Sequence, residues 1–288
     1  MFEARGGRTV LAHAYAEPPL RIGRTFDLGG AAYVILVCSG PGVFAGDTLR
    51  QSVHVGRGAR VVLTSQSALQ VHPAAGTFPA HPVRPADLPH SAVQAHSVDP
   101  HHPAPPALVH HEYIIESEAE LHCHWDPVIP FAGARLDQRF DLRLAESSRL
   151  SWGDAVMAGR VSRGEAWQFL SLAHELRLRV GPALAYLERY TLVPGERRIQ
   201  RPWICGSAPY LGTALVYHQS AKAETADALH REMAAVAGVA SAVDLITPRL
   251  LLARFLAGNG ASFSRARASY RASVIRSIFG GQELAGRK

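Results

Sequence analysis

The chain has 288 residues, of which 47% are hydrophobic and 19% are charged, and its formal net charge is +6. This balance is typical of a folded globular protein and excludes an intrinsically disordered chain. No apolar run reaches the ~18 residues that can span a bilayer, and the first residues lack the apolar core of a secretion signal. We therefore expect a cytoplasmic protein with no membrane partner.

Cysteine and charge patterns narrow the class further. Cys38, Cys123 and Cys205 are odd in number and far apart, which predicts no disulfide framework and fits a reducing compartment. The positive charge is almost all arginine, since Lys222 and Lys288 are the only lysines. The arginines are scattered and do not form a basic stripe with stacking aromatics, so we expect no nucleic-acid partner.

Most of the chain predicts short strands separated by turns, the rhythm of a mostly β protein. Apolar, alternating or β-branched runs that indicate strands occupy residues 8–15, 20–26, 31–37, 48–55, 59–66, 113–125, 126–131, 135–144, 149–157, 165–174, 175–180 and 186–192.

The last quarter changes character. Residues 221–237 are alanine-rich and predict a helix, and 262–279 predict a second helix between glycine-containing turns. Between them, residues 243–246 and 250–256 indicate a hairpin. We therefore expect a mainly β protein, one strand-rich domain over residues 1–288 with helical or sandwich-like β architecture and two α-helices near the C-terminus.

A glycine-rich turn at residues 39–47 joins two of the predicted strands. Its glycines invite comparison with a dinucleotide-binding loop, but such a loop needs a helix directly after the turn. The residues that follow alternate instead, and Val53 and Val55 are β-branched, which favours a strand. We therefore interpret Gly42 and Gly46 as structural residues of a bulged strand connection.

Histidine and proline concentrate in one segment, residues 72–111, which holds eight histidines and nine prolines. Proline at this density blocks helices and sheet ladders, so we expect residues 73–111 to be a flexible inserted surface loop. Because imidazole suits nickel and zinc, a loose metal reservoir is the alternative, although the irregular spacing specifies no geometry.

Two further histidines lie on a predicted strand. His122 and His124 alternate with Cys123, so both imidazoles face the same side. Two ligands make an incomplete metal site. The alternatives are therefore a weak metal site and an ordinary strand with one polar face.

The sequence contains no nucleophile elbow, phosphate-binding loop or zinc-protease helix motif. Asp47 and Glu165 are the notable carboxylates, because each ends a glycine-containing stretch. Such carboxylates either close turns through backbone hydrogen bonds or line a polar passage for a partly hydrated cation. Two other classes stay open, a β-rich module that binds sugars or peptides and a metal-dependent hydrolase using His122, His124 and a carboxylate.

Four stretches occur in order along the chain and carry a family resemblance. They are Gly-Val-Phe-Ala-Gly-Asp at 42–47, Leu-Thr-Ser-Gln-Ser-Ala at 63–68, Ile-Pro-Phe-Ala-Gly-Ala-Arg at 129–135 and Gly-Arg-Val-Ser-Arg-Gly-Glu at 159–165. Together they resemble the signature segments of the UreD/UreH family of urease accessory proteins. Gly133 and Gly164, in the last two stretches, are expected to be further turn residues.

The resemblance implies a non-catalytic scaffold and not an enzyme. It implies binding to a UreF-type accessory protein, through which a UreG-type GTPase joins, and contact with the urease apoprotein. Nickel would pass through transiently, with no tightly bound cofactor. By resemblance, the passage involves Asp47 and Glu165, with Thr64 and Gln66 as polar neighbours and Arg160 keeping a carboxylate charged.

Overall fold

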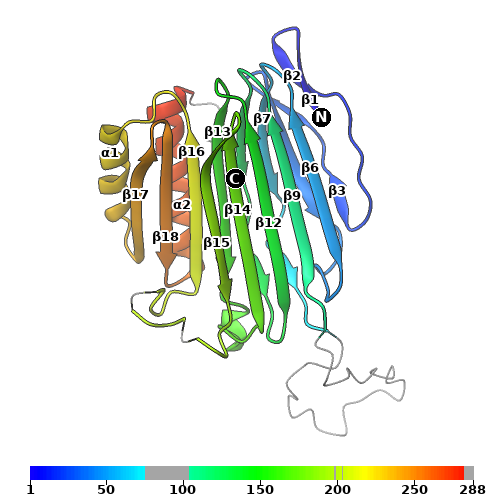
Figure 1. The fold of residues 1–288 in the computed structure, drawn as a ribbon, viewed down its shortest axis with the longest axis vertical. Coiled ribbons are helices and arrows are strands. Elements are labelled where there is room, and N and C mark those ends of the chain that lie inside the picture. Colours follow the sequence, from blue (N-terminus) through cyan, green and yellow to red (C-terminus); the bar gives the residue numbers. More distant parts are fainter. Residues whose placement is uncertain (75–103, 198, 203, 282–288) are drawn as a thin grey trace, which may run out of the picture.

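A computed structural model describes residues 1–74, 104–197, 199–202 and 204–281. Two β-sheets face each other and form the body of the fold (Figure 1). Sheet A has seven strands, β1 (Phe2–Arg5), β2 (Arg8–Leu11), β6 (Thr48–Val55), β9 (Ala107–Ile115), β12 (Arg135–Leu144), β14 (Ser171–Val180) and β15 (Ala183–Leu192). Sheet B has eleven, β3 (Leu20–Ile22), β4 (Phe26–Leu28), β5 (Ala31–Cys38), β7 (Arg60–Ser65), β8 (Leu69–Val71), β10 (Glu120–His124), β11 (Val128–Pro130), β13 (Arg149–Met157), β16 (Tyr210–Tyr217), β17 (Val239–Thr247) and β18 (Leu250–Ala257).

The middle of the chain winds as a flattened β-helix. It passes from sheet A to sheet B in each coil, from β6 to β7, from β9 to β10 and from β12 to β13. Each strand pairs in parallel with the strand one coil earlier. Parallel strands need a long crossover, and here the opposite sheet supplies it in place of a helix. Antiparallel strands close the two ends of the coil.

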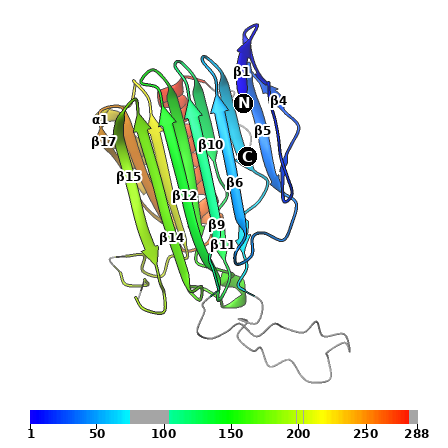
Figure 2. The ribbon, with the colours of Figure 1, turned by 45° about the vertical axis from the view of Figure 1, so that its right-hand side comes forward.

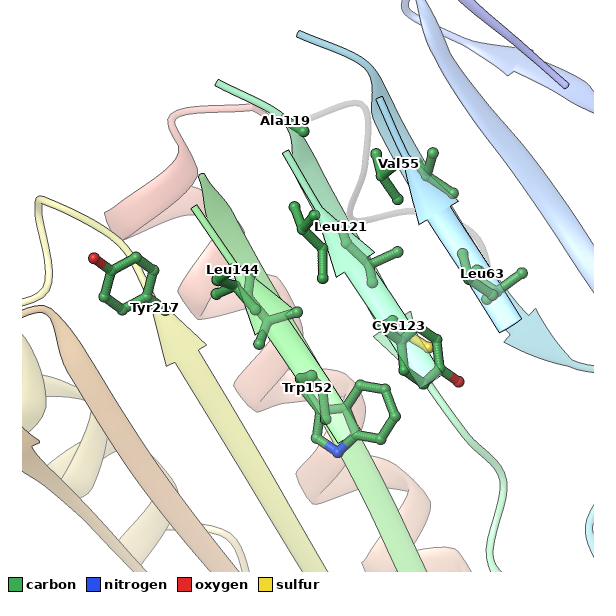
Figure 3. Packing of buried hydrophobic residues seen from close by; sticks show 14 of the residues in the cluster. Val55, Leu63, Ala119, Leu121, Cys123, Leu144, Trp152 and Tyr217 are labelled. Carbon is green, nitrogen blue, oxygen red and sulfur yellow. The ribbon is translucent and has the colours of Figure 1, made fainter. Parts of the chain in front are cut away.

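The core lies between the sheets. Buried and more exposed residues alternate along β9, β12 and β14, so one side of each strand faces inward. Trp152 from sheet B packs edge-on against Tyr113 and Phe140 from sheet A, with ring centroids 5.0 and 5.1 Å away. Figure 3 shows Trp152 beside Cys123, with Leu121, Leu144 and Leu63 farther along the same cluster. This aromatic and aliphatic layer fixes the two sheets against each other.

Two helices cover the outer face of sheet B. They are α1 (Ala223–Ala234) and α2 (Gly260–Val274), and α2 continues into a π-helical turn, Ile275–Phe279. Their apolar residues pack against β16 and β18 in a second core cluster, and Figure 1 shows α2 behind these strands. None of the helices in the described ranges is long and apolar enough to cross a membrane.

The mainly β class and both C-terminal helices are confirmed. Several boundaries were wrong, and β16 (Tyr210–Tyr217) was not predicted. Residues 113–125 hold the end of β9, a turn and then β10, and residues 165–180 hold a single strand that begins at Ser171. The expected loop at 73–111 ends earlier, because β9 begins at Ala107 and pairs with β6 and β12. Residues 75–103 of that segment lie outside the described residues.

Candidate functional site

Three of the four signature stretches meet at one corner of the coil. The Val43 N–H donates to the Gln70 carbonyl at 2.9 Å, and the Phe131 N–H donates to the Val71 carbonyl at 2.9 Å. These backbone bonds tie the first and third stretches to β8. The fourth joins through Arg160, whose guanidinium lies 4.1 Å from the centroid of the Phe131 ring.

The side chains at this corner form a continuous stack. The Phe44 ring stacks on His72 with centroids 4.6 Å apart, and the His72 ring meets Phe131 edge-on, also at 4.6 Å. On the other side of Phe131, Arg160 donates from Nε to Glu165 Oε2 at 2.7 Å. We call Phe44, His72, Phe131, Arg160 and Glu165 the corner stack. It links successive coils of the chain.

Both predicted carboxylates have local partners at this corner. Asp47 is exposed, and its Oδ2 accepts a hydrogen bond from the Phe44 N–H at 2.8 Å. Partial burial opposes ionisation of Glu165, but the hydrogen bond and charge of Arg160 lower its pKa below the ordinary value. A cavity of about 70 Å³ lies between the two sheets, and neither carboxylate is among the residues that line it. Their part in ion passage stays a prediction.

Thr64 and Gln66 lie apart from the corner stack. Thr64 is buried on β7, and its hydroxyl donates to the His124 carbonyl at 3.0 Å. Gln66 is exposed just after β7, and its N–H donates to the Leu36 carbonyl at 2.8 Å. The second signature stretch therefore joins neighbouring strands of sheet B.

All four predicted turn glycines take positive φ, at 130° for Gly42, 84° for Gly46, 76° for Gly133 and 74° for Gly164. Gly42 has a second constraint, because a Cβ there would overlap the carbonyl of Gln70. The same Gln70 carbonyl accepts the hydrogen bond from the Val43 N–H that joins the first signature stretch to β8.

We expect Gly42→Ala to destabilise the protein by more than the ~1–3 kcal/mol of backbone strain alone, because the overlap also displaces Gln70. Urea unfolding measures the change. Gly46→Ala is the matched control, since its Cβ would meet only Pro105 Cγ at 3.5 Å. Equal losses in the two variants would contradict this account.

His122 and His124 share the outer face of sheet B, beneath α2. The His122 Nε2 lies 2.8 Å from Glu120 Oε1, and the His124 Nε2 lies 3.2 Å from Ser151 Oγ. Desolvation and the positive charges of Arg271 and Arg267 hold the pKa of His124 well below 6.5. Within the described ranges, no group of three or more histidine, cysteine or acidic side chains could hold a metal.

Glu120 is the centre of a buried charge cluster on that face. Its Oε2 lies 2.9 Å from Arg149 Nε, and its Oε1 lies 3.7 Å from Arg60 Nε. Burial opposes ionisation of Glu120, but the hydrogen bond from His122 and the neighbouring positive charges lower its pKa below 4.5. The ring of Phe279, in the π-helical turn, covers His122 at a centroid distance of 4.5 Å.

A second polar group lies between the sheets, and the sequence alone did not indicate it. Its members occupy inward positions on neighbouring strands, and we call them the polar seam. They are Gln51, His111, Gln138, His174, Glu188 and Tyr190 from sheet A, and Asp154, Thr213 and Arg254 from sheet B. The cavity of about 70 Å³ opens along the seam, lined by Gln51, His111, Gln138 and Asp154 together with Ser65 and Asp126.

Several buried atoms of the seam are unsatisfied. Within the described residues, Asp154 Oδ1 and both ring nitrogens of His174 have no hydrogen-bond partner, and His174 Nε2 lies 3.7 Å from Asp154 Oδ2. Burial raises the pKa of Asp154 and, with His110, lowers that of His111 to about 3. Buried polar groups are normally hydrogen-bonded to water, an ion or protein. The unpaired atoms of the seam can therefore bind a polar ligand.

The chain matches the family model for the UreD urease accessory protein over residues 1–287. It belongs to this family. UreD 1 of Synechococcus sp. (strain JA-3-3Ab) is 29% identical over 210 residues, which cover 73% of this chain and 68% of the relative. UreD 2 of Streptomyces griseus subsp. griseus is 29% identical over 244 residues, or 81% and 73% of the two chains.

Other UreD relatives match over a shorter part of their length. The chain is 28% identical to the UreD of Trichodesmium erythraeum over 60% of its own residues, and it spans about half, 54%, of that relative. A UreH of Helicobacter hepaticus is 23% identical over 67% of this chain. All four relatives are named urease accessory proteins.

Proposed function

We propose that this UreD-family chain is a non-catalytic scaffold that gives nickel a transient path to apo-urease. In this proposal a UreF-type protein binds it, a UreG-type GTPase joins through UreF, and urease receives the ion. The cavity with the unsatisfied polar seam carries the proposal, because carboxylate, imidazole and amide side chains open into a cavity whose lining is otherwise mostly apolar. Family membership supplies the urease context.

The polar side chains that line the cavity suit an ion that is passed on. Asp154 and Asp126 offer carboxylate oxygens, and His111 offers an imidazole, all of which nickel accepts. A space of about 70 Å³ holds several water-sized guests, so the ion can keep part of its hydration shell. Within the described residues no three such groups converge into a tight site, which would otherwise retain the ion.

The corner stack and this cavity are built from neighbouring stretches of the chain. Leu49, Leu69 and Val128 line the cavity, and they stand two or three residues from Asp47, His72 and Phe131 respectively. In this proposal Asp47 and Glu165 contact the ion at the corner of the coil, and Asp154 contacts it inside the cavity. Arg160 supports Glu165 by keeping it ionised.

Urease matured with the double variant Asp47→Ala, Glu165→Ala is expected to contain about tenfold less nickel, for a loss of ~1.4 kcal/mol of ion contact. The chain should still fold and still form its complexes. Nickel per urease active site, measured by mass spectrometry after co-expression, gives the result. Arg163→Ala, an exposed change in the same turn, is the control. Full urease loading by the double variant would refute the role of the corner.

Co-purification separates the scaffold from the two other classes. The scaffold should copurify with UreF- and UreG-type proteins and carry weak, substoichiometric nickel. A metal-dependent hydrolase would carry stoichiometric tight metal, and a sugar- or peptide-binding module would bind its ligand without any urease protein. Either of these results, in the absence of the accessory complex, would replace the proposal.

A further inference from the structure

A second and larger cavity opens at the N-terminal end of the coil. This cleft has a volume of about 690 Å³ and lies between β6 of sheet A and β3 and β5 of sheet B. The connection between β2 and β3 forms its outer wall, through residues 13–19. Aliphatic side chains from both sheets line its floor, namely Leu20, Ile22, Val34, Leu36, Leu49, Val53 and Leu63.

One wall of the cleft is an unpaired strand edge. β6 pairs with β9 over its whole length, from Thr48 to Val55, but it pairs with β1 only where Val55 meets Phe2. Figures 1 and 2 show β1 beside the upper end of β6. Below that point the edge of sheet A ends at β6, inside the cleft.

The backbone hydrogen bonds at the two ends of β6 determine which of its residues face this edge. The carbonyls of Asp47 and Val55 accept from β9 residues and the residue after β9, while the Gly56 N–H donates to the Phe2 carbonyl on the β1 side. N–H and C=O of one residue point to the same side of a strand, and successive residues alternate. The even-numbered residues Thr48, Arg50, Ser52 and His54 therefore point their backbone groups into the cleft. Among the described residues, the pairing of Phe2 with Val55 engages the His54 carbonyl, and no backbone hydrogen bond engages Thr48, Arg50 or Ser52 on this side.

The charged side chains around the cleft favour an acidic segment beside the free edge of β6. Arg50 and Arg21 border the cleft, and neither makes an ion pair within the described part of the chain. The one acidic residue on the cleft wall, Glu17, is engaged by the Tyr15 hydroxyl. An acidic side chain on an added strand would lie across from Arg50, where opposite charges stabilise strand pairing.

We propose that this cleft receives an extended segment of a partner protein, which adds to sheet A beside β6. Alternate residues of the segment are apolar and lie on the aliphatic floor, and those between them are acidic and face Arg50. Strand addition at a free edge supplies backbone hydrogen bonds for affinity and side-chain pockets for specificity. Five residues in extended form span about 17 Å, the reach of the unpaired part of β6. This holds whether or not nickel passes through the polar seam.

A labelled heptapeptide of alternating valine and glutamate, titrated into the purified full chain by fluorescence anisotropy, tests the proposal. Ser52→Pro removes one cleft-facing N–H without touching the β9 ladder, and it should weaken binding at least tenfold. Ser52→Ala keeps the N–H and should bind as wild type. Arg50→Glu should weaken the glutamate peptide at least fivefold and favour a peptide with lysine in place of glutamate.

Three results would overturn the proposal. One is equal binding by Ser52→Pro and Ser52→Ala when both variants give the circular dichroism spectrum and melting temperature of wild type. Another is equal binding of a heptapeptide with the same composition in scrambled order. The third is slow amide exchange at Ser52 in the free chain with no peptide binding, which would mean that the chain's own residues fill the cleft.

Discussion

Urease matured with Asp154→Asn is expected to hold about tenfold less nickel, while the variant chain itself is as stable as wild type or more stable. The amide cannot supply the negative charge that attracts the ion in the seam, and a tenfold loss corresponds to ~1.4 kcal/mol. A buried carboxylate without a full set of partners costs free energy, so its neutral isostere removes that cost. A substitution that lowers nickel loading of urease but does not lower the stability of the chain identifies a residue that is retained for function.

The pH dependence of this difference has a fixed sign. Burial raises the pKa of Asp154 above 3.8 in the folded state, so folding favours the protonated form. The penalty is absent below pH 3.8, grows as pH rises through the raised folded pKa, and is complete above it. The stability advantage of Asp154→Asn should therefore shrink as pH falls towards 3.8, as measured by urea unfolding.

Asp137→Asn is the control for Asp154. Asp137 lies on the outer face of sheet A, where both its oxygens pair with Arg139 at 3.2 Å, and its loss should leave nickel loading unchanged. Full loading of urease by Asp154→Asn would remove the seam from the path. A marked loss of stability would show instead that the carboxylate is structural.

Glu120→Gln is expected to destabilise the chain by about 1.5–3 kcal/mol at pH 7, the usual contribution of hydrogen bonds to a charged group, because Arg149 and Arg60 keep more than a third of their side chains exposed. The amide leaves Arg149 and His122 without their anionic partner beneath Phe279. Because the pKa of Glu120 is lowered from 4.5, its contribution is complete above pH 4.5 and is lost as pH falls through the lower folded value. The difference between wild type and variant should narrow over that acidic range.

Glu118→Gln provides the comparison for Glu120. Glu118 pairs with Arg57 at 3.4 Å in an exposed position, and exposed pairs contribute only about 0–1 kcal/mol. Urea unfolding of both variants at neutral pH gives the two values. Similar small losses at the two positions would mean that the cluster beneath Phe279 does not anchor the π-helical turn.

Local patterns predicted the strands well where alternation is strict. Residues 135–144 coincide with β12, which alternates between buried, mainly apolar residues and more exposed polar residues. Residues 149–157 coincide with β13, although that strand is buried on both faces. The coil itself could not be predicted, since parallel pairing depends on which distant strand lies alongside. The turn between β9 and β10 was missed because apolar residues flank it closely on both sides.

The polar seam was missed for a different reason. Gln138 and His174 stand at inward positions of strands whose other inward residues are apolar, and a single polar residue there looks like an ordinary exception. His111 was assigned to the histidine-rich segment and not to a strand. Only when the coils stack do these residues come together. The corner glycines were recognisable in advance, because positive φ is a local requirement that a short sequence reveals.

β9 pairs with β6 without interruption, from Thr48 opposite Leu108 to Val55 opposite Ile115. This pairing shows how the chain accommodates inserted residues. The connection between β8 and β9 covers residues 72–106, far more than a tight corner needs. Closing a longer connection adds only ~0.6 kcal/mol for each doubling of its length, so the pairing of β9 with β6 tolerates a long one. Neighbouring coils, and not the linker, set the strand alignment, which leaves this corner free to acquire new sequence without disturbing the scaffold.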